Sequence, residues 1–260
     1  MGERIEINGH PTWVDERGGG AETVLLLHGG MSNSDLLLDA FGDPLAERYR
    51  IVAFDRRGHG YTADSPAAFH YEDMAAETIG VLEHVVEGRA HLVGWSDGGI
   101  VALAVAMSRP ELVDRLVVIG TNFHHDGVLP LELDEDSPVA AQLFEAYAAR
   151  SPDGPEHFGE LFEKFVAMAT TEPTWTVDDI AAITAPTLVM VGDDDLPRFT
   201  HTGELYEALP AGQLCVVPAT SHALPIERPV EVAHIIVDFL TAELPPATMM
   251  PVRRGSSTRA

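Results

Sequence analysis

The stretch Arg89-Ala-His-Leu-Val-Gly-Trp-Ser-Asp-Gly-Gly99 decides the fold of this chain. A short apolar run, 91–93, leads into Gly94-Trp-Ser-Asp-Gly98, and an apolar helical pattern follows over 100–107. This order predicts a strand, a tight turn that carries one serine, and a helix. Glycine at both ends of the turn leaves room where the chain reverses, since a side chain there would strike a neighbouring element. Ser96 is therefore expected at the tip, at the positive end of the helix dipole, which suits a nucleophile.

Strand and helix patterns alternate on both sides of this stretch. Apolar runs typical of strands stand at residues 23–27, 49–54, 116–120, 187–191 and 214–217, with helical patterns between most of them. The alternation predicts an α/β fold: a mostly parallel central sheet with right-handed crossovers and helices on both faces. A pair of strands turning at Asn8-Gly9 is expected to precede it, since Asn-Gly is a strong hairpin signal.

One long segment interrupts the alternation. Residues 122–185 carry helical patterns and no convincing strand, and strand and helix patterns then resume. We interpret this segment as a helical cap, or lid, inserted into a core domain formed by residues 1–121 and 186–241. Residues 242–260 are rich in Pro, Met, Arg and Ser and are expected to form a disordered tail.

Composition describes one soluble globular domain, or one domain with an insertion. Of the 260 residues 45% are hydrophobic, and no apolar run approaches the about 20 residues that span a membrane. The formal charge of -25 argues against nucleic acid or an anionic membrane as a partner. The polar start, 1–9, does not resemble a signal peptide, and the single cysteine, Cys215, can form no intrachain disulfide. We expect a cytoplasmic monomer or homodimer whose partner is a small molecule.

Two further residues stand where a serine nucleophile would need a general base and an acid that orients the base. In open α/β sheets, ligands bind beyond the carboxyl ends of the strands. Asp195 follows the apolar run 187–191, and His222 follows the run 214–217. A serine nucleophile needs a base, and the base needs an orienting acid, so the order Ser96, Asp195, His222 predicts a catalytic triad.

The motifs together resemble the α/β-hydrolase fold superfamily. They are His28-Gly29-Gly30, Asp55-Arg-Arg-Gly-His-Gly60, Gly94-Trp-Ser-Asp-Gly98, Gly192-Asp-Asp-Asp195 and Ser221-His222. The resemblance covers residues 3–241. Within it, Gly-Trp-Ser-Asp-Gly-Gly and the tract from Leu196-Pro-Arg-Phe to Ser221-His222 are similar to the biphenyl hydrolase-like and valacyclovir hydrolase branch.

This resemblance implies a role for each motif residue. Ser96 would be the nucleophile, His222 the general base and then acid, and Asp195 the residue that orients the imidazole. The backbone N–H groups of Gly30 and Asp97 would form the oxyanion hole. The resemblance also implies a serine hydrolase acting on small esters, without metal or organic cofactor. A carbon–carbon bond hydrolase, a cofactor-free perhydrolase and a non-catalytic ligand-binding protein are the alternatives on this fold.

The acid of the triad is not unique in the sequence. Gly192 is followed by three aspartates, and the tract after them looks shorter than is common in the branch. Spacing from the glycine favours Asp195, while Asp193 and Asp194 remain alternatives.

Asp97 is the second open question. Its side chain could face solvent, cap the helix or face the substrate, and an aspartate at a helix N-terminus is favourable by itself. Resemblance to the amino-acid-ester-cleaving branch implies pairing with a protonated amine of the substrate.

The remaining candidates are weaker. Trp95, Met31, Phe162 and Phe165 are expected to contact the substrate, the two phenylalanines from an apolar stripe on the helix expected over 155–169.

Three other features are expected to be structural. The tract Asp55 to Gly60 is expected to hold the sheet edge to a neighbouring loop, and His28 to be a hydrogen-bonded scaffold residue. His124-His125-Asp126 invites interpretation as a metal site, but no third ligand stands at a convincing spacing. We predict no metal site.

Overall fold

The structure is a computed structural model that describes residues 2–130, 138–243 and 248–250. The centre of this part is an eight-stranded sheet with the spatial order β1-β2-β4-β3-β5-β6-β7-β8. The strands are β1 (Glu3–Ile7), β2 (His10–Gly18), β3 (Thr23–Leu27), β4 (Arg50–Phe54), β5 (Ala90–Trp95), β6 (Val113–Ile119), β7 (Thr187–Asp194) and β8 (Gly212–Ser221). β1 and β2 are antiparallel, and the pairs from β4 to β8 are parallel, which confirms the predicted sheet.

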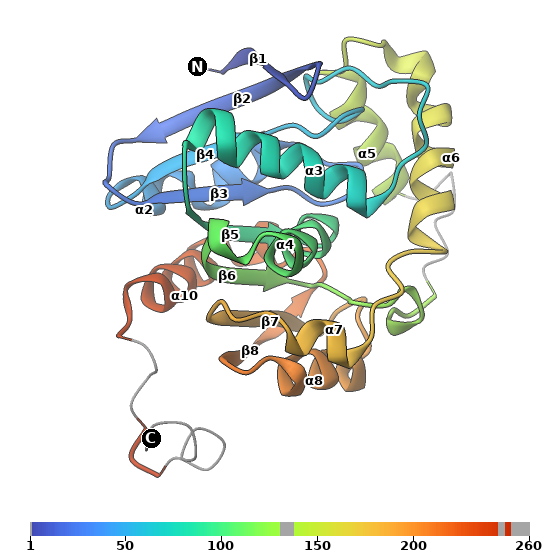
Figure 1. Cartoon of the computed structure of the whole chain (residues 1–260). Coiled ribbons are helices and arrows are strands. Elements are labelled where there is room, and N and C mark those ends of the chain that lie inside the picture. Colours follow the sequence, from blue (N-terminus) through green and yellow to red (C-terminus); the bar gives the residue numbers. More distant parts are fainter. Residues whose placement is uncertain (1, 131–137, 244–247, 251–260) are drawn as a thin grey trace.

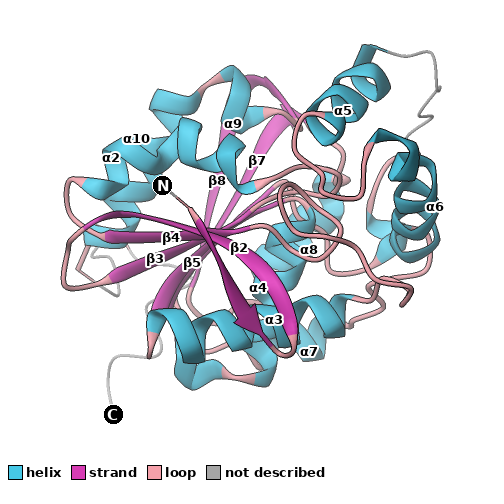
Figure 2. Cartoon of the chain, turned by 90° about the horizontal axis from the view of Figure 1, so that it is seen from above, coloured by secondary structure: helices cyan, strands magenta, loops and turns pink. Residues whose placement is uncertain are grey.

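Helices cover both faces of this sheet (Figures 1 and 2). One face is covered by α1, α2, α9 and α10, and the other by α3, α4, α7 and α8. The helices are α1 (Ser34–Leu37), α2 (Asp43–Ala46), α3 (Tyr71–Val81), α4 (Asp97–Ser108), α5 (Pro138–Ala148), α6 (Phe158–Ala169), α7 (Val177–Ala181), α8 (Phe199–Ala208), α9 (Leu224–Glu227) and α10 (Pro229–Thr241). Two π-helical turns, Leu38–Gly42 and Leu82–Val86, continue α1 and α3.

The apolar run of β3 shows why both faces are covered. All five residues of the strand are buried. Leu25 and Leu27 pack with the helices of one face, while Val24 and Leu26 pack with those of the other. Successive side chains of a strand point to opposite faces, so a continuous apolar run requires a layer on each side.

The stretch around Ser96 forms the predicted strand, turn and helix. β5 ends at Trp95 and α4 begins at Asp97, with Ser96 between them at φ 54 and ψ -121. A left-handed backbone at a residue other than glycine costs about 1–3 kcal/mol and persists only when its surroundings impose it. At Ser96 close packing imposes this conformation: the turn lies so near β3 that a Cβ on Gly98 would collide with the carbonyl group of Leu27.

Gly98→Ala is therefore expected to lower the free energy of unfolding by about 1–3 kcal/mol or more, because the new methyl group overpacks the turn. Gly203→Ala is the matched control: it lies in α8, with nothing within 4 Å of an added Cβ. That substitution is expected to stabilise by about 0.5–1 kcal/mol, since alanine is the better helix former. Urea unfolding of both variants measures the difference, and equal effects would contradict this account of the turn.

The segment between β6 and β7 is helical, and its helices lie in two different places. α5 and α6 lie beyond the carboxyl ends of the parallel strands, whereas α7 lies beside α8 on one face of the sheet (Figures 1 and 2). Ile180 of α7 belongs to the hydrophobic core of that face. We propose that the cap expected over 122–185 consists of the part with α5 and α6, and that α7 packs as part of the core domain.

Polar contacts hold the α5–α6 segment to the core. Arg150 Nε, just after α5, donates to Asp35 Oδ2 at 2.9 Å. Lys164 Nζ of α6 donates to Asp64 Oδ2 at 2.6 Å, and the Asp64 side chain is only 2% exposed. A charge pair shielded from water in this way is costly to break from one side, so it favours a docked α6.

Part of the predicted tail, residues 244–247 and 251–260, lies outside the described residues, as does 131–137 of the predicted cap. Among the helices of the described part, none combines the length and the apolar character needed to cross a membrane.

Candidate active site

The structure brings Ser96, His222 and Asp195 into one line of contacts. His222 Nε2 lies 2.9 Å from Ser96 Oγ, and His222 Nδ1 lies 2.6 Å from Asp195 Oδ1. Ser96 follows β5, Asp195 follows β7 and His222 follows β8. Because these strands are parallel, their carboxyl ends reach the same edge of the sheet, and side chains 126 residues apart can meet there.

Backbone groups hold the two partners of Ser96 in place. Asp195 Oδ2 accepts from the N–H of Gly192 at 3.0 Å, and Oδ1 accepts from the N–H of Leu196 at 2.7 Å. The indole N–H of Trp95 donates to the carbonyl oxygen of His222 at 2.9 Å. The Asp195 side chain is 2% exposed, so this carboxylate interacts with His222 with little screening by water.

The three consecutive aspartates have different surroundings. Asp193 is exposed, and its Oδ1 accepts from the N–H of Thr220 at 3.2 Å. Hydrogen bonds from the backbone N–H groups of Ala219 and Thr220 hold the pKa of Asp193 below its usual range. The pairing of β7 with β8 shifts register between Gly192 and Asp194, and such a bulge re-aims the residues that follow it. Of the three aspartates, the structure places the carboxylate of Asp195 against His222.

The two expected oxyanion donors lie side by side. Gly30 stands on the turn after β3, and Asp97 is the first residue of α4. A Cβ placed on Gly30 would stand 2.7 Å from Asp97 Oδ2, and one placed on Gly29 would stand 3.4 Å from the Cβ of Ser96. Within the part of the chain that the structure describes, neither the Gly30 nor the Asp97 N–H has a hydrogen-bond partner. Both donors are available to a third group beside Ser96.

The Asp97 side chain points inward. Of the three orientations left open by the sequence, the structure shows neither exposure nor a helix cap: the residue is 5% exposed, and Oδ1 accepts from the Tyr71 hydroxyl at 2.8 Å. Oδ2 is buried without a hydrogen-bond partner among the described residues. Burial raises the pKa of Asp97, while the positive charge of Arg56 and the bond from Tyr71 lower it.

Sequence reasoning did not find Tyr71. It lies at the start of α3, in a part of the chain where no motif pointed to the site, and its hydroxyl reaches Asp97 across 26 positions. A tyrosine hydroxyl that is buried usually has a hydrogen-bond partner, but the sequence does not say which.

The four residues expected to contact substrate, which are Met31, Trp95, Phe162 and Phe165, come from different elements of the structure. The Phe165 ring of α6 lies against Gly30, where an added Cβ would collide with it. Phe162 is partly buried in the same hydrophobic cluster, in which Met31 is 5% exposed. Trp95 is half-buried and supports His222 through its indole. The turn of residues 28–31 is called the oxyanion turn below: Met31 is part of it, and the rings of Phe165 and Trp95 lie against Gly30 and Gly29. Contact with substrate stays a prediction for all four.

The tract from Asp55 to Gly60 joins loops, as the sequence predicts. Asp55 Oδ1 accepts from the N–H of Ser34 at 2.7 Å, and Oδ2 accepts from the N–H of Tyr61 at 2.8 Å. His28 is fully buried and hydrogen-bonded. Both features support the turn after β3 from the side of β4.

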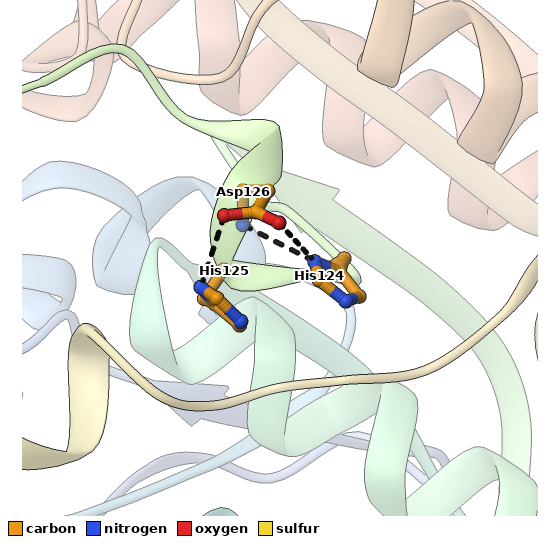
Figure 3. A group of neighbouring side chains, drawn as sticks. All are labelled: His124, His125 and Asp126. Atoms are coloured by element: carbon orange, nitrogen blue, oxygen red, sulfur yellow. Dashed lines mark hydrogen bonds and ion pairs between the residues drawn. The ribbon is translucent and has the colours of Figure 1, made fainter.

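Among the residues that the structure describes, two groups of possible metal ligands lie outside this site. His124, His125 and Asp126 stand together (Figure 3), with the Asp126 carboxylate 3.8 Å from His124 Nδ1 and 3.4 Å from His125 Nδ1. His124 Nδ1, however, already accepts from the N–H of Asp126. In the second group, around Asp64 and His157, the Lys164 ammonium already supplies a cation to Asp64. Neither arrangement leads us to predict a metal site.

Comparison with known proteins agrees with this fold. The model of the Alpha/beta hydrolase family matches residues 24–235. The human protein named serine hydrolase BPHL is 26% identical over 260 residues, which cover 91% of this chain and 85% of that protein. RutD of Variovorax paradoxus (strain S110), a carbamate hydrolase by provisional assignment, is 31% identical over 244 residues, which cover 84% of this chain and 91% of that protein.

Solved structures share the architecture. The meta-cleavage product hydrolase CumD of Pseudomonas fluorescens IP01 matches with a TM-score of 0.77 at 22% identity, over 92% of this chain and 97% of that one. The comparisons confirm the predicted fold class and the resemblance to the biphenyl hydrolase-like branch.

Proposed function

Because this chain belongs to the alpha/beta hydrolase family, we propose that it is a serine hydrolase that cleaves small carboxylic esters through an acyl-enzyme. The observation that carries the proposal is the line of contacts at 2.9 and 2.6 Å from Ser96 through His222 to Asp195. A serine held at the tip of a strand–helix turn, with a base on its oxygen and an acid behind the base, is arranged for acyl transfer.

The proposed steps follow from this geometry. His222 Nε2 takes the Ser96 proton as the serine oxygen attacks the ester carbonyl. The N–H groups of Gly30 and Asp97 receive the negative charge of the tetrahedral intermediate, at the positive end of α4. His222 then protonates the leaving alcohol, and the same imidazole activates the water that releases the acid. Asp195 keeps Nδ1 protonated, so that Nε2 can act as the base.

Two measurements test the proposal. Wild-type protein is expected to react with a fluorophosphonate probe and to turn over p-nitrophenyl esters, with a preference among acyl chains of graded length. A dienoate ring-cleavage product, and acetate with peroxide, test the carbon–carbon hydrolase and perhydrolase alternatives. A protein that the probe does not label and that cleaves no ester would overturn the proposal and favour a non-catalytic binding role.

We further propose that Asp97 favours substrates with a protonated α-amino group. The free, buried Oδ2 lies against Gly30 in the oxyanion turn, while Oδ1 is held by Tyr71. A buried carboxylate oxygen without a partner is costly, and a substrate ammonium would supply both the missing charge and the missing donor. The Arg56 charge acts on Asp97 in favour of its ionised form.

Asp97→Asn is expected to lower kcat/KM for an α-amino ester about 10- to 100-fold more than for its deaminated analogue, as loss of a charged hydrogen bond would. Asparagine keeps the backbone N–H and a side-chain oxygen that can accept from Tyr71. The variant is therefore expected to cleave the deaminated analogue nearly as well as wild type does, and the analogue serves as the control. In wild type the preference for the amino ester is expected above the pKa of Asp97 and lost as the pH falls through it. Because burial raises that pKa, the loss is expected at a higher pH than for an exposed aspartate.

The ratio of kcat/KM for the two esters is the proper readout, since a change in the catalytic steps that both substrates share cancels in the ratio. Equal kcat/KM for both esters in wild type would contradict the role of Asp97.

Carbamate hydrolysis is a second candidate. It is favoured by the 31% identity with RutD, which the name describes as a carbamate hydrolase by provisional assignment. The same nucleophile and oxyanion donors would act on a carbamate carbonyl, so a p-nitrophenyl carbamate belongs in the substrate panel. Turnover of the carbamate together with slow turnover of every ester would favour this second function.

A further inference from the structure

A buried guanidinium lies directly behind the oxyanion turn. Arg56 follows β4 and is the largest of the fully buried side chains in the described part of the chain. Its Nη1 donates to the carbonyl oxygen of His28 at 2.7 Å, and its Nη2 donates to that of Gly29 at 3.3 Å. These two residues immediately precede Gly30. The arginine therefore binds the backbone of the oxyanion turn, from the side that faces away from solvent.

His28 holds the same turn from its own side chain. Its Nδ1 donates to the carbonyl oxygen of Gly29 at 2.7 Å, and its Nε2 accepts from the N–H of Arg56 at 3.2 Å. Burial, and then the positive charge of Arg56, hold the pKa of His28 well below its usual range. One neutral tautomer satisfies both bonds. The Gly29 carbonyl oxygen is thus held by two donors.

The Gly29 carbonyl and the Gly30 N–H belong to one peptide unit. This unit is planar and trans, so the two groups point in opposite directions. Donors that hold the carbonyl oxygen on the buried side therefore aim the Gly30 N–H toward the opposite side. A charged donor on the oxygen also polarises the amide, which makes its N–H a stronger donor.

The other interactions of Arg56 do not account for this arrangement. Asp97 and Glu77 are its main sources of opposite charge, yet the hydrogen bonds of its two Nη groups go to backbone carbonyls. An arginine that only neutralised a buried carboxylate would be expected to bind it through its paired N–H groups. The donors of Arg56 are directed instead to the two residues before Gly30.

We propose that Arg56 is a positioning residue of the oxyanion hole: its guanidinium holds the His28 and Gly29 carbonyls and so aims the Gly30 N–H at the reacting oxygen. The inference rests on the proposed function, because it assigns Gly30 to the oxyanion of ester cleavage. Arg56 acts through the backbone and does not itself touch the substrate.

The test uses two variants of Arg56 and one control. Arg56→Lys keeps the charge but cannot span two carbonyls, and Arg56→Met removes charge and donors. Arg57→Met is the control: the neighbouring arginine donates to Ser65 Oγ at 3.1 Å and to the Ala68 carbonyl at 2.9 Å, on another part of the same tract.

Each protein is assayed with a p-nitrophenyl ester and with the matching thionoester, in which sulfur replaces the carbonyl oxygen. Sulfur is a weak acceptor, so the oxyanion donors assist the thionoester much less. Arg56→Lys and Arg56→Met are expected to lower kcat for the oxygen ester by about 10- to 100-fold with little change in KM, because a misplaced donor acts on the transition state. The ratio of ester to thionoester rate is expected to fall by a similar factor, and Arg57→Met is expected to keep the wild-type ratio.

The ratio is independent of how much of a sample is folded, since unfolded protein lowers both rates equally. Loss of both rates by the same factor would overturn the inference and leave Arg56 with a structural role only, as would an unchanged kcat in both variants. A wild-type protein inactive on both esters would overturn the proposed function, and this inference with it.

Discussion

Ser96→Ala is expected to lower kcat for p-nitrophenyl esters by about 10⁴- to 10⁶-fold and to abolish labelling by a fluorophosphonate. The serine hydroxyl is the group in contact with His222 Nε2, and alanine leaves the imidazole without an oxygen to activate. The residual rate is expected to exceed that in water, because the N–H groups of Gly30 and Asp97 remain in place. Initial rates and mass spectrometry of the labelled protein measure the two effects.

Ser108→Ala is the matched control for this variant. Ser108 ends the same helix, α4, and its hydroxyl donates to the Ala104 carbonyl at 2.8 Å, at the far end from the turn. Its activity and labelling are expected to equal those of wild type. Labelling of the Ser96→Ala protein at wild-type rate would place the nucleophile elsewhere and refute the proposed function.

Asp195→Asn is expected to lower kcat by about 10⁴-fold, with substrate binding largely kept. The asparagine amide can donate to His222 Nδ1, which stabilises the tautomer with its proton on Nε2. That tautomer cannot accept the Ser96 proton, so the effect is on chemistry rather than on shape. A large effect is expected because the Asp195 carboxylate is only 2% exposed and lies 2.6 Å from the imidazole.

Asp193→Asn and Asp194→Asn are the matched controls, since both neighbours are exposed carboxylates at the end of β7, directly before Asp195. Both variants are expected to stay within a few-fold of wild type. Wild-type activity in Asp195→Asn, together with a large loss in one of the other two, would move the acid to that residue and revise the proposed triad.

The sequence predicted the fold from local signals. The hairpin at Asn8-Gly9, where both residues have positive φ, follows from two residue types that tolerate this backbone. Likewise, the apolar run of β3 predicts a strand buried on both faces, and the glycines that flank Ser96 predict a tight turn. Such features depend on near neighbours along the chain, and so a single sequence can reveal them.

A residue of the site was predictable only where it lies next to one of these local sequence patterns. Ser96 and His222 stand directly after recognisable strands, and the parallel sheet brings the ends of those strands together. The choice among three aspartates was not predictable to the same degree, because a register shift between β7 and β8 sets which carboxylate turns toward His222. A shift of this kind depends on pairing between strands and has no local signature.

By itself, the sequence determined the order of the elements, the tight turn that carries Ser96 and the residue types available at the sheet edge. Only the tertiary structure decided how Asp97 and Arg56 are used. Asp97 turns inward because Tyr71, 26 positions away, holds one of its oxygens, and Arg56 reaches back 28 positions to the carbonyl of His28. Backbone conformation depends mainly on adjacent residues, whereas the direction of a buried polar side chain depends on which distant groups complete its hydrogen bonds.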